Sequence, residues 1–162
     1  MSISGVELWK RVEEYLDSQG WEYSTSSKAI ELNFSMNNQL EKCNMIIRFI
    51  TYDNGKFSVH TRTVCPLRVP AEKKDHIFEL ITRANYGMID GYFSYLLPDQ
   101  DSEEGLIEYN SRLYCGDILP SLNDIESSVD FPLHIMTKYG DAIFNVLKHD
   151  ANPEEQIQCV EG

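Results

Sequence analysis

The sequence predicts a single α+β domain in which an antiparallel β-sheet carries helices mainly on one face. The chain has 162 residues with 42% hydrophobic content, which suffices for one sizeable core and is too little for two. Helical and strand-like periodicities follow one another in the order helix, strands, helix, strand hairpin, helices. Short turns join the strands, which favours antiparallel pairing and the α+β class.

Residues 4–20, SGVELWKRVEEYLDSQG, predict the first helix. Ser4 and Glu7 have the spacing of a capping box, and Gly20 is a typical stop signal. Between these signals apolar side chains recur at helical intervals. The segment AIELNFSM at residues 29–36 then alternates apolar and polar side chains with a period of two, which predicts a strand.

The stretch NMIIRFITYDNGKFSVHTRTV, at residues 44–64, predicts a β-hairpin. Asn54 and Gly55 are preferred in a two-residue type I′ turn between two strands. If Asp53 faces Lys56 across this turn, four large side chains share one face of the sheet: Ile50, Tyr52, Phe57 and Val59.

Both alternating sets of side chains in the first arm of this hairpin are apolar, so both faces of the sheet are expected to need cover there. Two alternatives follow for the second face. Either the C-terminal helices or the tail wrap over it, or a partner protein or a second copy of the chain covers it. Under the second alternative, Ile50, Tyr52, Phe57 and Val59 are candidate partner-binding residues.

Residues 66–87, PLRVPAEKKDHIFELITRANYG, predict the second helix, with Pro70 at its first position and Gly87 at its end. Gly87 is expected to adopt a positive φ, and Gly91 is expected to allow a close approach of the backbone. A second hairpin follows, in which the acidic loop DQDSEEG, residues 99–105, joins two strand-like segments.

The C-terminal part of the chain returns to a helical pattern. Pro132 is expected to break or bend this helix, and Gly140 is expected to end one helix before another begins. Residues 1–150 are then expected to form the domain, and residues 151–162 a flexible tail.

Composition narrows the classes of partner. A net charge of −12, with a pI near 4.6, argues against nucleic acid, because phosphate backbones are bound by clustered Lys and Arg. No signal-peptide pattern is present, and no apolar run approaches the roughly 18 residues of a membrane span. The four cysteines are scattered without a C-x-x-C pair, as in reduced cytosolic proteins. The sequence therefore predicts a cytoplasmic protein without a nucleic-acid or membrane partner.

No local motif predicts a catalytic residue, a metal or a cofactor. The cysteines and histidines form no recognisable nucleophile and base motif, and no glycine-rich phosphate loop is present. The chain is therefore expected not to be an enzyme. The alternative is an enzyme or small-molecule sensor with an unrecognised cleft.

Four cationic residues stand out on predicted strands of this acidic protein: Arg48, His60, Arg62 and Arg112. Ion pairs across the strands or to a helix explain them. The alternative is that Arg48, Arg62 and Arg112 bind an anionic small-molecule ligand.

The stretch VPAEKKDHIFELITRANYGMIDGYF, at residues 69–93, resembles the YbjN family. The shared features are a helix that begins with Val-Pro and ends near Asn, a strand that begins with Gly-Tyr or Gly-Phe, an acidic hairpin, and a late helix with a Pro-Leu step. The similarity runs from GWEY at residues 20–23 to Gly140.

This resemblance implies a fold like that of type III secretion chaperones, and the general family label of proposed bacterial sensory-transduction regulator. It brings no catalytic pattern with it. The expected function is a non-catalytic protein-binding or regulatory, chaperone-like module of the bacterial cytoplasm, with a protein partner or a homodimer.

Overall fold

The computed structural model describes residues 3–162. Its helices and strands follow one another in nearly the predicted order. The elements are α1 (Gly5–Ser18), β1 (Ser24–Thr25), β2 (Ala29–Ser35), β3 (Lys42–Thr51), β4 (Phe57–Val69), the short 3₁₀ helix η1 (Ala71–Lys73), α2 (Lys74–Asn85), β5 (Tyr92–Leu96), β6 (Gly105–Gly116), α3 (Leu122–Lys148) and α4 (Pro153–Glu161). The six strands form one sheet in the order β1-β2-β3-β4-β6-β5, and every neighbouring pair is antiparallel.

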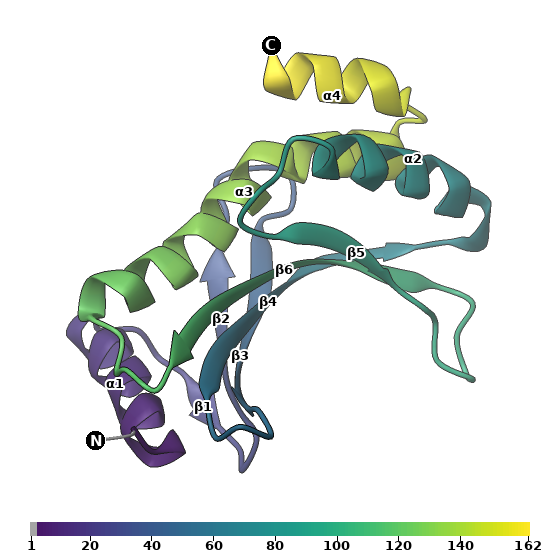
Figure 1. Ribbon diagram of the computed structural model, residues 1–162. Helices are drawn as coiled ribbons and strands as arrows, with labels where there is room; N and C mark the ends of the chain where they lie inside the picture. Colours follow the sequence, from purple (N-terminus) through teal and green to yellow (C-terminus); the bar gives the residue numbers. More distant parts are fainter. Residues whose placement is uncertain (1–2) are drawn as a thin grey trace.

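The helices cover one face of this sheet (Figure 1). β4 and β6 arch, so that the face turned away from the helices is concave. We call it the open face. The prediction of an α+β domain with helices on one face is confirmed, and the C-terminal helices do not wrap over the second face as one alternative required.

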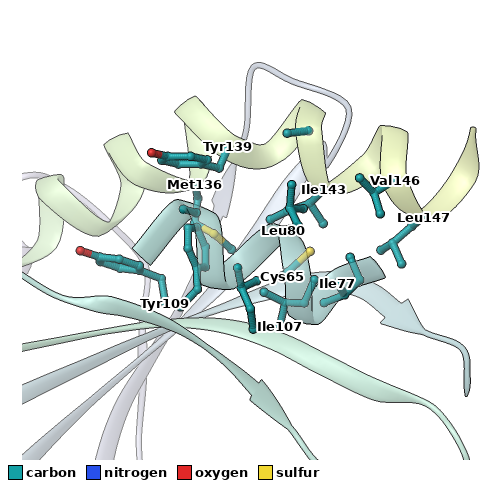
Figure 2. Packing of buried hydrophobic residues seen from close by; sticks show 14 of the residues in the cluster. Cys65, Ile77, Leu80, Ile107, Tyr109, Met136, Tyr139, Ile143, Val146 and Leu147 are labelled. Atoms are coloured by element: carbon teal, nitrogen blue, oxygen red, sulfur yellow. The ribbon is translucent and has the colours of Figure 1, made fainter. Parts of the chain in front are cut away.

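Two apolar clusters fill the space between the helices and the sheet. In the first, side chains from α2 and α3 meet those of β4 and β6, as Figure 2 shows for Leu80, Ile143 and Ile107. In the second, α1 and the first turns of α3 pack on β2, β3 and β4. Among the described residues, no helix is both long enough and apolar enough to cross a membrane.

Local signals placed the first helix correctly and located the second. The predicted start of the second helix at Pro70 is wrong, because Pro70 is extended and precedes η1, and α2 begins at Lys74. Ser4 Oγ accepts a hydrogen bond from the Glu7 N–H at 3.2 Å, and the Glu7 carboxylate accepts one from the Ser4 N–H at 2.8 Å, so the predicted capping box is present. In α2 the predicted apolar stripe is the buried one, formed by Ile77, Leu80, Ile81 and Ala84.

The register of the hairpin between β3 and β4 differs from the prediction by one residue. Thr51 pairs with Phe57, whereas the two-residue turn would pair Tyr52 with Phe57. Only Gly55 of the turn has a positive φ, and Asn54 does not, so the loop is a three-residue loop with a glycine bulge instead of a type I′ turn. A shift of one residue sends every side chain of one strand to the opposite face relative to the other strand.

The predicted helix end at Gly140 is wrong, because α3, a helix of 27 residues, continues past Gly140 to Lys148. Gly140 is buried, and a Cβ there would collide with the side chain of Asn38 from the loop between β2 and β3. The amide of Asn38 donates to the carbonyl of Met136 at 3.0 Å, and the Gln39 N–H donates to Asp141 at 2.8 Å. The glycine thus lets a loop dock closely on the helix. Pro132 also lies inside α3 without ending it.

The expected flexible tail of residues 151–162 instead contains α4. Asn152 caps this helix by accepting a hydrogen bond from the Glu155 N–H at 3.1 Å, and Pro153 begins it. Ile157 is buried and belongs to the first apolar cluster, and α4 lies over α2 and α3 on the side away from the sheet (Figure 1). The Asn-Pro-Glu-Glu start signal of this helix is visible in the sequence, but its single buried isoleucine gives little periodicity.

All four cysteines are free, and they differ in burial. Burial raises the pKa of the Cys43 thiol to about 11 and that of Cys65 to about 12, whereas Cys159 is exposed on α4.

We expect a colorimetric thiol reagent at neutral pH to modify Cys159 first in the native protein, and to count four thiols in denaturant. The Cys159→Ser variant should lack the fast phase. A second fast thiol, or fewer than four thiols in denaturant, would contradict this assignment.

Candidate functional site

The four residues predicted to share one face are divided between the two faces of the sheet. Phe57 and Val59 are buried in the cluster beneath α1. Tyr52 and Ser58 meet on the open face, where their hydroxyl oxygens lie 3.1 Å apart, and the register places Ile50 opposite Ser58. The predicted four-residue partner surface therefore does not form, because the longer loop shifts the register by one residue.

An ion pair between Arg62 and Glu108 lies at the centre of the open face. Glu108 accepts hydrogen bonds from the guanidinium of Arg62, with Nε at 2.9 Å, from Ser94 Oγ at 3.2 Å and from Asn110 Nδ2 at 3.3 Å. The Glu108 side chain is only 9% exposed and that of Arg62 17%. Arg62 is thus held in a cross-strand ion pair, as one sequence-based explanation proposed.

Arg48 and Arg112 occupy a different position from Arg62. His60 on β4 lies directly opposite Arg48 on β3 and directly opposite Arg112 on β6, so these three side chains form one row across the open face. Both arginines are exposed, and neither forms an ion pair within the described part of the chain. The row brings together two of the three arginines that the sequence suggested as a ligand site.

The open-face row is bordered by tyrosines. Arg112 Nη1 donates to the hydroxyl of Tyr52 at 3.2 Å, and the rings of Tyr52 and Tyr114 lie 6.0 Å apart. Burial, followed by the charge of Arg62, lowers the pKa of His60 from its ordinary value, while a hydrogen bond that the imidazole donates to the Asn110 side chain and the charge of Glu108 oppose the change. His60 is therefore neutral near pH 7, and the charge of the row comes from the two arginines.

β6 has a free edge beside this row. β6 contains 12 residues and β5 contains five, and β5 pairs only with residues 106–110 of β6. In Figure 1 the part of β6 nearest its arrowhead runs past the start of β5, so it has β4 beside it and no strand on the side away from β4. Because alternate residues of a strand direct their N–H and C=O groups to opposite sides, residues 111–115 present backbone groups away from β4. We call residues 111–115 the free edge.

A groove of about 840 Å³ runs along the free edge. One wall is β6 from Asn110 to Leu113, the second is the first half of α3, and residues 89–92 close one end. Phe131 and Pro132 supply apolar surface to the α3 wall, while His60 and Arg112 line the groove on the side of the open face. Ser111 Oγ, also in the lining, is buried without a hydrogen-bond partner in residues 3–162.

Three large side chains beside the free edge are exposed to solvent. Ile89 is 93% exposed, Tyr114 58% and Tyr92 55%. We call these three residues the edge patch. None of the three was among the candidates predicted from the sequence. For Ile89 a signal was present, because Met88 and Ile89 are large apolar residues between Gly87 and Gly91, which is unusual for a polar surface loop.

The outer edge of β5, in contrast, is protected. Asn85 at the end of α2 donates to the Phe93 carbonyl at 2.9 Å and accepts from the Phe93 N–H at 2.7 Å. Its side-chain amide thus takes the place of a neighbouring strand at this residue. The side chain of Asn85 therefore satisfies the backbone of β5 at this residue, whereas no strand within residues 3–162 pairs with residues 111–115 of β6 on the side away from β4. At the end of this segment the Cys115 carbonyl accepts a hydrogen bond from the Ile118 N–H at 3.1 Å.

This arrangement offers backbone hydrogen bonds, apolar surface and positive charge, which are the means of binding another chain. Within residues 3–162, no group of three or more His, Cys, Asp or Glu residues is arranged to hold a metal ion.

Comparisons with known proteins support the fold. The sequence matches no protein-family model and no curated protein. The structure is similar to the crystal structure of YbjN, a proposed transcription regulator from E. coli, with a TM-score of 0.57 and 10% sequence identity. The match covers 86% of this chain and 95% of that chain. The chain therefore shares the fold of YbjN, as the resemblance in its sequence predicted.

Proposed function

We propose that this chain is a non-catalytic protein-binding module of the bacterial cytoplasm, which binds an extended segment of a partner protein as an added strand along the free edge. The observation that carries the proposal is the unpaired length of β6, beside the shorter β5. Main-chain hydrogen bonds supply affinity in this mode of recognition, and side-chain pockets supply specificity. The resemblance to a proposed regulator is compatible with such a role.

The surroundings of the free edge differ from those of a protected edge. Natural sheets protect exposed edges with covering segments, prolines, bulges or inward-pointing charges. Residues 111–115 contain no proline, and the only charged residue among them is Arg112, which hydrogen-bonds to Tyr52 over the open face. A register shift between the pairs Phe57–Gly116 and Ser58–Tyr114 places a bulge at Cys115, so the regular part of the free edge is residues 111–114. The edge patch and the apolar residues of the groove would be buried by an added strand, which stabilises association.

A partner segment fits this edge better than a second copy of the chain. Each copy has a net charge of −12, so two copies repel one another as they approach. A short extended segment carries little charge and is narrow enough for a groove of about 840 Å³. We therefore expect the protein alone to be a monomer by light scattering, and a dimer through β6 would contradict the proposal.

The test uses short peptides as the probe. Heptapeptides selected from a random displayed library against the immobilised protein are synthesised, and hydrogen exchange is measured with and without each peptide. We expect the peptides to slow exchange of the backbone amides of residues 111–115, because an added strand hydrogen-bonds to alternate groups of β6. Selection of no binder, or slowed exchange confined to other segments, would overturn the proposal.

Ile89→Glu should weaken peptide binding by about tenfold or more, because a charge replaces apolar surface in the groove wall. At 93% exposure, Ile89 contributes little to folding, so the melting temperature should stay nearly unchanged. Leu97→Glu is the matched control, since Leu97 is 70% exposed in the hairpin after β5 and is absent from the groove lining. Equal loss of affinity in both variants would contradict binding at the free edge.

A further inference from the structure

We infer that the partner segment bound at the free edge carries an acidic side chain, Asp or Glu, directly opposite Arg112. This inference rests on the proposed function and names the chemistry of the segment that the same site binds. It follows from the register of the sheet and from the distribution of charge on the open face.

The geometry of an added strand fixes which of its side chains meets Arg112. Residues directly opposite one another on neighbouring strands direct their side chains to the same face, about 5 Å apart. Arg48, His60 and Arg112 already occupy such opposite positions on β3, β4 and β6. A strand added beside β6 therefore extends this row by one residue, and that residue lies on the open face next to Arg112.

The row needs a negative charge that the described chain does not supply. Arg48 on β3 and Arg112 on β6 lie on either side of His60 on β4, so the row of these three residues carries two positive charges and no negative one. The carboxylate of Glu108 on the same face is already engaged by Arg62, Ser94 and Asn110. Asp90 also lines the groove, but it forms no ion pair with either arginine in residues 3–162.

The alternate positions of the added strand face a different environment. The side chains on either side of the acidic residue point toward α3, where Leu113, Phe131 and Pro132 line the groove. On the open face, the position two residues away on one side lies opposite Tyr114, whereas on the other side Tyr92 of β5 already occupies the position opposite Asn110. The segment is therefore expected to alternate, with apolar residues toward α3, an acidic residue opposite Arg112, and a residue opposite Tyr114 two positions further along.

His60 gives the inference a pH dependence. The charged groups around it are Arg48 on β3, Arg62 on its own strand, and Glu108 and Arg112 on β6. A carboxylate bound beside the row favours the protonated imidazole, so binding of an acidic segment should tighten as the pH falls from 7.5 toward 5.5. A His60→Gln variant should lose this pH dependence.

The experiment compares three residues at each position of a selected heptapeptide. Each position in turn is occupied by Glu, Gln or Lys, and dissociation constants are measured by fluorescence anisotropy at low ionic strength. At one position we expect Glu to bind about fivefold more tightly than Gln, and Lys more weakly than Gln. The difference should shrink in 0.5 M salt, where charges that are exposed are screened.

Variants of the protein identify the arginine responsible. Arg112→Gln should abolish the preference for Glu, and Arg112→Glu should invert it in favour of Lys. Arg68→Gln is the matched control, because Arg68 is exposed on β4 opposite Leu106, outside the row. Arg48→Gln should reduce the preference less than Arg112→Gln, since two strands separate Arg48 from the added strand.

The outcomes separate this inference from the proposed function. Slowed exchange at residues 111–115 with equal affinities for Glu and Gln at every position would overturn the inference and leave the proposed function in place. A preference for Glu that persists in Arg112→Gln would also overturn it. If no peptide slows exchange at the free edge, both fail together.

Discussion

Replacing Glu108 by Gln should destabilise the protein by about 3–5 kcal/mol, because it leaves the guanidinium of Arg62 charged and unpaired in a site that is largely buried. The change keeps the shape of the side chain, so the loss comes from charge and not from a cavity. Equilibrium urea unfolding of the wild type and the variant measures the difference. We expect a lower midpoint with an unchanged slope.

Glu104→Gln is the control for this prediction. Glu104 is exposed in the loop between β5 and β6 and forms no ion pair within residues 3–162, so the same chemical change should alter stability by less than about 0.5 kcal/mol. The double variant Arg62→Met with Glu108→Leu should recover much of the lost stability, because it removes both charges. A loss below about 1 kcal/mol in Glu108→Gln would show that water reaches and screens Arg62.

The hairpin between β3 and β4 is a case in which the sequence pattern identifies the strands but does not determine their pairing register. Asn54 and Gly55 between two segments of strand-forming residues predicted both strands, but both alternating sets on β3 are apolar, so burial gave no preference between the two registers. Asn54 and Gly55 fit a two-residue loop and a three-residue loop with a glycine bulge about equally well. The conformation of Asn54 decides between them, and that depends on the folded sheet.

The C-terminal helices illustrate a different limit. Glycine and proline are helix-breaking signals in local sequence, and both lie inside α3. Gly140 is explained by contact with Asn38, a residue about a hundred positions earlier in the chain. The residues next to Gly140 in the sequence cannot predict such a long-range contact. A capping box, by contrast, is formed by residues three positions apart, such as Ser4 and Glu7.

The candidate site was only partly predictable. The cationic residues stood out because arginines on strands of an acidic protein are conspicuous in the sequence. Which of them is paired depends on cross-strand register, which placed Glu108 within reach of Arg62 and left Arg48 and Arg112 without a carboxylate. The groove depends on β5 ending before β6 does and on the path of α3, and neither follows from local periodicity.

The two glycines between α2 and β5 have different roles. Gly87 does not have the positive φ that the sequence predicted, and a Cβ there would meet nothing within 4 Å. A Cβ at Gly91 would overlap the backbone oxygen of Asn110 and the hydroxyl group of Tyr109, whose ring carbon Cζ would lie only 2.7 Å away. Gly91 is therefore the position where the chain passes closest to β6.

Gly91→Val should consequently destabilise the protein by about 1–3 kcal/mol or more, because β6 backbone cannot move aside without disturbing its pairing with β4. Gly87→Ala, with open space around it, should leave stability within about 0.5 kcal/mol or raise it slightly by restricting the unfolded chain. Thermal melts and urea unfolding of both variants measure the difference in stability.

Because Gly91 also lines the groove, the fraction of the Gly91→Val protein that remains folded should bind selected peptides more weakly than the wild type does. Equal stability of the two variants would show that residues 87–91 do not pack on β6 in solution.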